Sequence, residues 1–214
     1  MELKFIDLFA GMGGFRIGFE EAARELGYTP HCVFSSEIKP YAINVYQHNF
    51  AEKTIHGDIT QIDENTIPDF DVLLAGFPCQ AFSSAGKSLG FEDTRGTLFF
   101  DVARVLKAKQ PKGFILENVE GLVRHDNGNT LKVILQTLFD LGYTTNWKLL
   151  DSKYHGLAQS RQRIYIVGTK NGTAVDLNFE KSEPVRLQDI LEEGIPSTKS
   201  VFTKQLLKHY PIQS

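Results

Sequence analysis

One cysteine stands where a strand of the predicted fold ends, and its surroundings make it a candidate nucleophile. The apolar run 71–76 predicts a buried strand, and Phe77-Pro78-Cys79-Gln80 leads from it into a polar loop, 81–96. In an α/β sheet, ligands and reacting groups gather at the carboxyl ends of the strands. A cysteine thiolate placed there can attack an electrophilic carbon and can leave again. The alternative is an inert buried cysteine, which is the commoner role of a single cysteine.

A carboxylic acid, Glu117, ends another predicted strand, 113–117. Because the ends of parallel strands meet at one edge of a sheet, we expect Glu117 to lie near Cys79. An acid can bind a base ring by donating or sharing a proton, which requires a partly desolvated position and a raised pKa. The two residues together indicate a thiolate nucleophile and an acid that holds a base ring.

A glycine-rich turn, 7–14, follows the first predicted strand and opens a helix, so a ligand could approach its backbone closely. Two acids follow the next two predicted strands. Glu37 could accept hydrogen bonds from ribose hydroxyls, and Asp58 could meet an adenine amine while Ile59 packs against the ring. Either acid alone would be interpreted as a solvated strand-end residue. Their succession favours a pocket for an adenosine-type cofactor.

Two better-known nucleotide motifs are absent from the sequence. The nicotinamide fingerprint needs a third glycine where this chain has Arg16. Gly86-Lys87-Ser88 resembles the end of a phosphate-binding P-loop, but Ala81 occupies the position of its first glycine, and the segment lies inside a predicted loop. These departures exclude nicotinamide chemistry of the usual kind and nucleoside triphosphate hydrolysis.

Apolar strand patterns alternate with helical patterns along most of the chain, which predicts a doubly wound α/β sheet. The predicted strands are 3–7, 31–36, 53–56, 71–75, 113–117, 146–150 and 163–168. The predicted helices are 13–26, 40–48, 96–109 and 129–141, followed by short ones at 187–191 and 203–210. The pattern weakens after Thr169. We therefore expect a catalytic domain over 1–170, and a linker or the start of a further region over 171–214.

The helical spacing also predicts which side chains face the core. In the first helix these are Phe15, Ile17, Gly18, Phe19, Ala22 and Leu26. In the third they are Leu98, Phe99, Val102, Val105 and Leu106. Cys32 lies in an apolar strand and Trp147 in another, and both are expected in the core.

The composition is that of an ordinary soluble globular protein. The net charge of −3 argues against nonspecific coating of nucleic acid, though one local basic face could still bind DNA. No run approaches the roughly 18 apolar residues of a membrane span, and the first residues enter a strand, so we expect no membrane segment and no signal peptide. Two cysteines and no ligand spacing among the histidines favour a reducing, cytoplasmic setting and no metal.

Five segments occur in a familiar order: Phe9-Ala-Gly-Met-Gly-Gly14, Gly76-Phe-Pro-Cys-Gln-Ala-Phe-Ser83, Arg95-Gly-Thr-Leu-Phe-Phe100, Glu117-Asn-Val119 and Gln159-Ser-Arg-Gln-Arg163. With this set the chain closely resembles the bacterial DNA cytosine-5 methyltransferases from about Leu3 to Gly168. The resemblance implies a Rossmann-like S-adenosylmethionine-dependent methyltransferase fold, with a mostly parallel seven-stranded sheet that includes an antiparallel strand. It also implies methyl transfer to C5 of a flipped cytosine in double-stranded DNA, as part of a restriction-modification system.

The resemblance assigns roles to particular residues of this sequence. The catalytic group comprises the nucleophile Cys79, the acid Glu117, and Gln80, Arg161 and Arg163 in support. The S-adenosyl-L-methionine pocket comprises Phe9, Gly11, Met12, Gly13, Gly14, Glu37, Ile38, Asp58, Ile59, Gly76, Pro78 and Leu98. The loop that closes over the flipped base would contact DNA through Ser83, Ser84, Lys87 and Arg95. For Lys87 and Arg95 the alternative is a solvated loop surface.

The sequence departs from the family pattern in three respects. Ala158 replaces a proline before Gln159, and Met12 replaces a branched aliphatic residue. The family continues into a target-recognition region and a returning C-terminal segment, and we expect this chain to stop before both. Three hypotheses therefore stay open: a DNA cytosine-5 methyltransferase, a cofactor-binding module that needs a second polypeptide, and an enzyme that acts on transfer RNA.

Overall fold

The computed structural model describes residues 1–51, 54–78, 98–170 and 172–191. The chain divides into two compact units, one made of Met1–Asp151 with Gln162–Glu180 and the other of Ser152–Arg161 with Lys181–Ser214. The first unit holds a mixed β-sheet and four α-helices among its described residues. The expected domain boundary at residue 170 stays a prediction.

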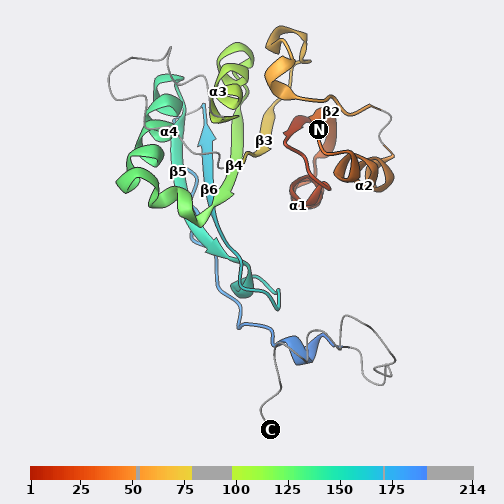
Figure 1. Ribbon diagram of the computed structural model, residues 1–214, viewed down its shortest axis with the longest axis vertical. Helices are drawn as coiled ribbons and strands as arrows, with labels where there is room; N and C mark the ends of the chain where they lie inside the picture. Colours follow the sequence, from red (N-terminus) through yellow and green to blue (C-terminus); the bar gives the residue numbers. More distant parts are fainter. Residues whose placement is uncertain (52–53, 79–97, 171, 192–214) are drawn as a thin grey trace. The chain divides into compact units, whose positions relative to one another are not determined.

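The sheet of the first unit has six strands in the described part of the chain, in the order β2-β1-β3-β4-β6-β5 (Figure 1). Their bounds are Glu2–Leu8 for β1, Thr29–Ser36 for β2, Val72–Gly76 for β3, Gly113–Val119 for β4, Thr144–Asp151 for β5 and Gln162–Thr169 for β6. Strands β1 to β4 pair in parallel, and β6 runs antiparallel to both of its neighbours. The predicted doubly wound α/β sheet with an antiparallel strand is confirmed.

The described residues form six strands where seven were predicted, because 54–56, the described part of the strand expected at 53–56, form no strand. His56 makes an isolated bridge to Ser36, with its N–H donating to the carbonyl of Ser35 and its own carbonyl accepting from the N–H of Glu37. The chain turns away at once through Gly57 and Asp58. A single pair of residues is too short to extend the sheet.

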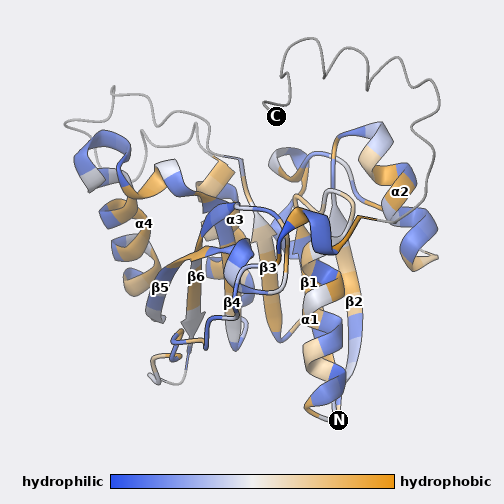
Figure 2. Ribbon diagram, turned by 90° about the horizontal axis from the view of Figure 1, so that it is seen from below, coloured by the Kyte–Doolittle hydropathy of each residue, from blue (hydrophilic) through white to orange (hydrophobic). Residues whose placement is uncertain are grey.

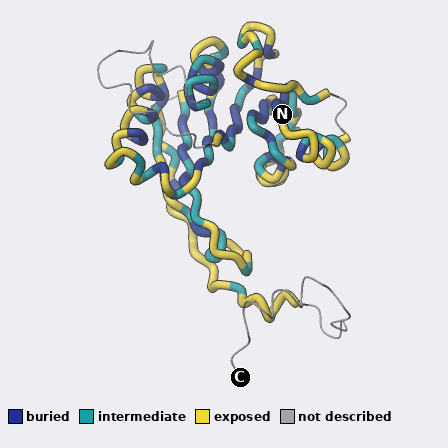
Figure 3. The backbone as a smooth tube through the Cα atoms, in the orientation of Figure 1, coloured by how far each residue is buried: buried dark blue, intermediate teal, exposed yellow. Residues whose placement is uncertain are grey.

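Helices cover both faces of the sheet. Helices α3 (Leu98–Lys109) and α4 (Asn129–Asp140) bury apolar residues in one cluster with alternate side chains of β1, β3 and β4, including Ile6, Leu73 and Leu116. Helix α1 (Gly14–Glu25) packs on the other face, where Phe19 lies 4.9 Å from Phe5 between ring centroids. Figure 2 shows β3 as hydrophobic and the edge strand β5 as largely hydrophilic, and Figure 3 shows the buried positions along the central strands. The spacing correctly predicted the buried face of α3.

The buried face of α1 differs from the prediction. Its buried residues are Arg16, Glu20 and Ala23, whereas Ile17 and Leu26 are 44% and 75% exposed. Arg16 is tolerated there because its guanidinium donates to Glu20 at 2.6 Å and lies 4.1 Å from the centre of the Phe50 ring. A paired charge has therefore taken the place that hydrophobic spacing assigned to apolar side chains.

The remaining elements follow the predicted order. Helix α2 spans Pro40–Phe50, and the region predicted as a helix at 187–191 contains a single 3-10 turn, η6, at Leu187–Asp189. Trp147 is 37% exposed because β5 is an edge strand, so its core assignment is wrong, and Cys32 is only partly buried. The helix expected at 203–210 lies outside the described residues. In the part of the chain that the structure describes, no helix is both long and apolar enough to cross a membrane.

The second unit is small in its described part. A 3-10 turn, η5, spans Ser152–Tyr154, and the N–H of Ser182 donates to the carbonyl of Tyr154 at 2.9 Å. The ammonium groups of Lys153 and Lys181 each lie 4.8 Å from the centre of the Tyr154 ring. These contacts join the two segments of the unit.

Candidate active site

The strand order places a ligand site between β1 and β3. The chain leaves β1 towards β2 on one side, and β3 and β4 then follow on the other, so the direction of winding reverses between β1 and β3. In open α/β sheets the crevice at such a reversal, outside the carboxyl ends of the strands, binds ligands. Here β1 ends in the glycine turn and β3 ends at Gly76, three residues before Cys79. The glycine turn and Gly76, both predicted site residues, therefore lie at the edge of the sheet that topology favours.

The glycine turn uses its glycines for two different purposes. Gly13 has φ +89°, and a Cβ there would lie 2.1 Å from Cε2 of Phe50, so the helix start can pack on α2 only without a side chain. Gly11 has φ +55°, and a Cβ there would meet no atom within 4 Å. No described residue therefore blocks this side of Gly11, and the approach of a ligand to the turn stays a prediction.

Glu37, at the end of β2, is hydrogen-bonded to the glycine turn. Its Oε2 accepts from the N–H of Gly11 at 2.8 Å, and its Oε1 accepts from the N–H groups of Ile38 and Lys39 at 2.9 Å each. The residue is 9% exposed. An ionised carboxylate offers about four acceptor positions, so these three bonds leave room for one further donor such as a hydroxyl. Ile38 is 63% exposed beside it.

Asp58 begins the 3-10 turn η1, Ile59–Gln61, and caps it. Its Oδ1 accepts from the N–H of Thr60 at 3.0 Å, and its side chain is otherwise exposed. Ile59 is 2% exposed and belongs to the core cluster. The exposed acid is therefore held beside an anchored apolar residue, while the contact of Ile59 with a ring stays a prediction.

Glu117 and Arg163 form an ion pair on the face of the sheet that α1 covers. Nε of Arg163 lies 2.8 Å from Oε1 of Glu117, and the two side chains are 19% and 25% exposed. Glu117 pairs with Gly76 of β3 on one side and with Tyr165 of β6 on the other. A Cβ on Gly76 would lie 3.4 Å from the other oxygen of Glu117. The predicted acid and one predicted arginine are thus together, next to the strand that leads to Cys79.

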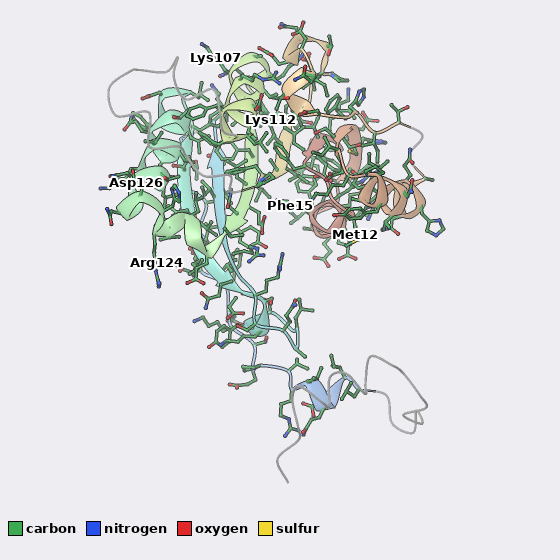
Figure 4. The ribbon with its side chains drawn as sticks, in the orientation of Figure 1. Met12, Phe15, Lys107, Lys112, Arg124 and Asp126 are labelled. Carbon is green, nitrogen blue, oxygen red and sulfur yellow. The ribbon has the colours of Figure 1, made fainter. Side chains whose placement is uncertain are left out.

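The start of α1 approaches this ion pair. The rings of Phe15 and Tyr165 meet edge to face with centroids 6.3 Å apart, and Tyr165 lies directly opposite Glu117 in the sheet. Figure 4 labels Phe15 and Met12 at this end of α1, and Met12 is 59% exposed. The spacing assigned Phe15 to the core alone, since it carries no information on which strand the ring meets.

Asn118 holds the segment before the cysteine, a role that the sequence reasoning missed. Its Nδ2 donates to the carbonyl of Phe77 at 2.9 Å, and its Oδ1 accepts from the N–H of Val119 at 2.8 Å. The residue is 2% exposed. An asparagine in a mostly apolar strand was the available signal, because a buried amide needs partners.

A buried polar group under the glycine turn was also missed. The hydroxyl of Tyr46 donates to Asp7 at 3.1 Å and accepts from Nη1 of Arg16 at 3.2 Å. Burial raises the pKa of Asp7 to about 7, and the hydrogen bond from Tyr46 opposes this only in part. The group joins β1 to α1 and α2, the elements on either side of the cofactor candidates.

The other predicted site residues are distributed as follows. Pro78 is exposed and is the last described residue before a gap, and Leu98 is the half-buried first residue of α3 after it. Arg161 belongs to the second unit, and its carbonyl accepts from the N–H of Ser152 at 3.3 Å. The residues that lie outside the described part are Cys79, Gln80, Ser83, Ser84, Lys87 and Arg95.

Comparison with known sequences finds bacterial type II methyltransferases as relatives. The chain is 58% identical over 217 residues to the type II methyltransferase M.NgoBV of Neisseria gonorrhoeae, which covers 98% of this chain and 51% of the relative. It is 48% identical over 191 residues to the type II methyltransferase M.HhaI of Haemophilus parahaemolyticus, covering 89% of this chain and 56% of the relative. The chain thus spans about half the length of the curated relatives that it matches.

Solved structures share the fold. A triple mutant of DNMT2 from Spodoptera frugiperda matches with a TM-score of 0.69 and 25% identity, covering 90% of this chain and 60% of that one. A DNA modification methyltransferase encoded within an E. coli prophage matches with a TM-score of 0.68 and 25% identity, covering 91% and 56%. The family model described as C-5 cytosine-specific DNA methylase matches residues 3–214. By that match over nearly its whole length, this chain belongs to the C-5 cytosine-specific DNA methylase family.

Proposed function

We propose that the chain is the catalytic part of an S-adenosylmethionine-dependent DNA cytosine-5 methyltransferase of a restriction-modification system. The observation that carries the proposal is the ion pair of Glu117 and Arg163 beside Gly76, the residue from which β3 leads to Cys79. An acid and a fixed cation next to a strand-end cysteine suit covalent chemistry on a pyrimidine ring. The type II methyltransferases that are 48% to 58% identical support the same reaction.

The residues at the ends of β1 and β2 fit an adenosine-type cofactor. Gly11 leaves its backbone open, Glu37 has capacity for one more donor, and Asp58 presents an exposed carboxylate. The first would meet the amino acid portion of the cofactor, the second a ribose hydroxyl and the third the adenine amine. S-adenosylmethionine, when bound, supplies an electrophilic methyl group on sulfur.

Cys79 would act as the nucleophile. Carbon C5 of cytosine is too weakly nucleophilic to accept a methyl group directly. Addition of the Cys79 thiolate to C6 forms a sulfur–carbon bond and moves an electron pair towards C5, which then takes the methyl group. A base, water among the candidates, removes the C5 proton, and the returning electron pair breaks the bond to sulfur. Cys79 is released as the thiolate that it was before the attack.

Glu117 and Arg163 would hold the ring while the charge moves. Glu117 at ring nitrogen N3 would donate or share a proton as C6 is attacked, and an arginine would hold the carbonyl oxygen O2. Arg163 already donates from Nη1 to the carbonyl of Gln162 at 2.7 Å, which helps to fix its plane. Arg161 is the second candidate for O2. Because Arg163 already pairs with Glu117, the cytosine ring would bind Glu117 while that ion pair is present.

Double-stranded DNA is the proposed substrate, and the base must leave the stack to reach Cys79. Extrusion costs a few kcal/mol, which phosphate contacts from Ser83, Ser84, Lys87 and Arg95 would partly offset. Because the chain spans about half of its curated relatives, sequence recognition is assigned to no residue here. A second polypeptide, or a further segment, is the proposed source of that recognition.

Transfer of labelled methyl groups to DNA cytosine tests the proposal. We expect label in DNA with the native protein, none with Cys79→Ser, and nearly native transfer with Cys32→Ser. Cys32 is the matched control because its thiol donates to the carbonyl of Phe34 at 3.4 Å and a serine can do the same. Full activity of Cys79→Ser would overturn the assignment of the nucleophile.

The substrate is tested by competition. DNA and transfer RNA are offered together, and we expect label in DNA alone. An oligonucleotide with 5-fluorocytosine should form a covalent adduct detectable by mass, because fluorine does not leave as a proton does. If label is found only in transfer RNA, then transfer RNA, and not DNA, is the substrate. Transfer that needs an added polypeptide would identify the chain as a subunit.

A further inference from the structure

Arg104 of α3 binds the segment that carries Asp58. Its Nη2 donates to the carbonyl of Ile59, and its Nη1 donates to the carbonyl of Ile62 at 2.9 Å. The same guanidinium reaches Glu64 at 2.5 Å and Asp101 at 3.0 Å. Two backbone carbonyls and two carboxylates therefore share one planar cation that is 27% exposed.

The segment itself has little other support from the sheet. From His56 to Ile62 the chain contains no strand and pairs with the sheet only through the isolated bridge of His56 to Ser36, among the described residues. The turn that starts at Asp58 is closed by local bonds, from Thr60 to the carboxylate and from Gln61 to the carbonyl of Asp58. The turn itself is anchored over long range by the buried side chain of Ile59 and by Arg104, whereas the later part of the segment is held by the buried Ile67 and Phe70.

We infer that Arg104 is a positioning residue for the adenine end of the cofactor site, acting through the Ile59 and Ile62 carbonyls to set where the Asp58 carboxylate lies. The inference rests on the proposed function, because it needs the adenine amine at Asp58. Arg104 touches no reacting group. Its task is to keep a short, weakly paired segment in one place relative to the glycine turn.

Arginine suits this task better than lysine. Its planar fork donates in fixed directions to several acceptors at once, whereas an ammonium is a single point charge on a flexible stem. Lys109 of the same helix shows the contrast. Its Nζ lies 3.4 Å from the carbonyl of Asn65 and 3.6 Å from Asp69, without contact to the Asp58 turn.

The test compares binding of S-adenosylhomocysteine with binding of its inosine analogue, which lacks the adenine amine, in the full-length protein. The native protein should prefer the adenosine compound. Arg104→Lys should weaken binding of that compound by roughly ten- to a hundredfold, the loss expected when one hydrogen bond to a charged group is misplaced. It should leave binding of the inosine analogue nearly unchanged, so the preference collapses. Lys109→Gln should keep the preference.

Three further measurements separate positioning from general destabilisation. Amide hydrogen exchange over 58–62 should speed up in Arg104→Lys and stay slow in Lys109→Gln. In Arg104→Lys, the KM for S-adenosylmethionine should rise, while kcat, measured at saturating S-adenosylmethionine, should stay close to the native value. Arg104→Lys should have no further effect on the preference once Asp58 is changed to asparagine.

Each outcome decides one question. An intact preference in Arg104→Lys, with a native protein that binds S-adenosylhomocysteine, overturns the role of Arg104 alone. A native protein that binds neither compound overturns the proposed function, and this inference with it. If Arg104→Lys does not fold, Asp101→Asn removes the carboxylate that orients Nε, and a fall in preference of roughly two- to threefold is then expected.

Discussion

Arg163 meets Glu117 because β6 runs against β4. The register pairs Val119 with Arg163 and Glu117 with Tyr165, so the arginine lies diagonally across from the acid, with Nε 2.8 Å from Oε1. In a parallel neighbour, the first residues of the strand would lie at the opposite edge of the sheet. The single reversed strand thus brings a cation from the start of one strand to the end of another.

Glu117→Gln should abolish most catalysis while sparing the cofactor. A glutamine keeps the shape but cannot supply a proton to the ring, and loss of a positioned acid typically costs about 10²–10⁴-fold in rate. Arg163 keeps its bond to the carbonyl of Gln162, so the site should stay ordered. Methyl transfer and S-adenosylhomocysteine binding are measured together. Glu120→Gln, three residues along the chain, is the control and should remain active. A fully active Glu117→Gln would show that the ring is held by another group.

Asn118→Ala should reduce both stability and activity. It leaves the buried carbonyl of Phe77 and the N–H of Val119 without their partners, a loss on the order of 2 kcal/mol in the free energy of unfolding. The displaced segment before Cys79 should lower methyl transfer by about 10²-fold.

The chain contains a matched control for Asn118. Asn146 donates to the carbonyl of Val175 at 3.0 Å and accepts from the N–H of Trp147 at 2.8 Å, the same pair of bonds on an edge strand. Asn146→Ala should cost on the order of 1 kcal/mol in urea unfolding and leave kcat unchanged. Equal losses of activity in the two variants would show that Asn118 acts through stability alone.

Gly13→Ala and Gly14→Ala should have opposite effects on stability. At Gly13 an added Cβ needs φ +89° and lies 2.1 Å from the Phe50 ring, so we expect a loss of about 2–5 kcal/mol. At Gly14 the new methyl meets no atom within 4 Å, and alanine favours the helix by up to about 1 kcal/mol. Thermal unfolding of the two variants checks this. A harmless alanine at Gly13 would mean that Phe50 can move aside.

Asp7 should make part of the stability fall as pH rises. Its pKa is raised from 3.8 to about 7 by burial, so between these values the folded protein binds more protons at this site than the unfolded chain does. The contribution of Asp7 is therefore full at low pH, declines as pH passes from about 4 to about 7, and is lost above that.

Asp7→Asn isolates this effect because it keeps the shape and removes the charge. The variant should gain stability relative to the native protein on going from pH 5 to pH 8, measured by urea unfolding at both values. Asp71 is a useful contrast. Its salt bridge with Lys112 lowers its pKa, so its stabilisation is lost only as pH falls. A constant difference between native protein and Asp7→Asn across this range would contradict the assignment.

The local pattern of residues was enough to predict most of the elements and several site residues. Apolar runs of strand length, amphipathic spacing in α3, and glycines after the first strand are short-range features, so they can be recognised without knowing what packs against them. Glu37, which follows β2, and Glu117, which lies two residues before the end of β4, were identified for the same reason. Their positions depend on where a strand stops, which neighbouring residues decide.

The tertiary structure decided which strands are neighbours, and that determined the site. Three features depend on pairing between distant segments: the reversal between β1 and β3, the antiparallel β6 that carries Arg163, and the absence of a strand at 54–56. The burial of Arg16 against α2 and the hydrogen bond from Arg104 to the carbonyl of Ile59 likewise depend on partners far along the chain. A buried charge is stable only when those partners are present, so no local pattern could have shown it.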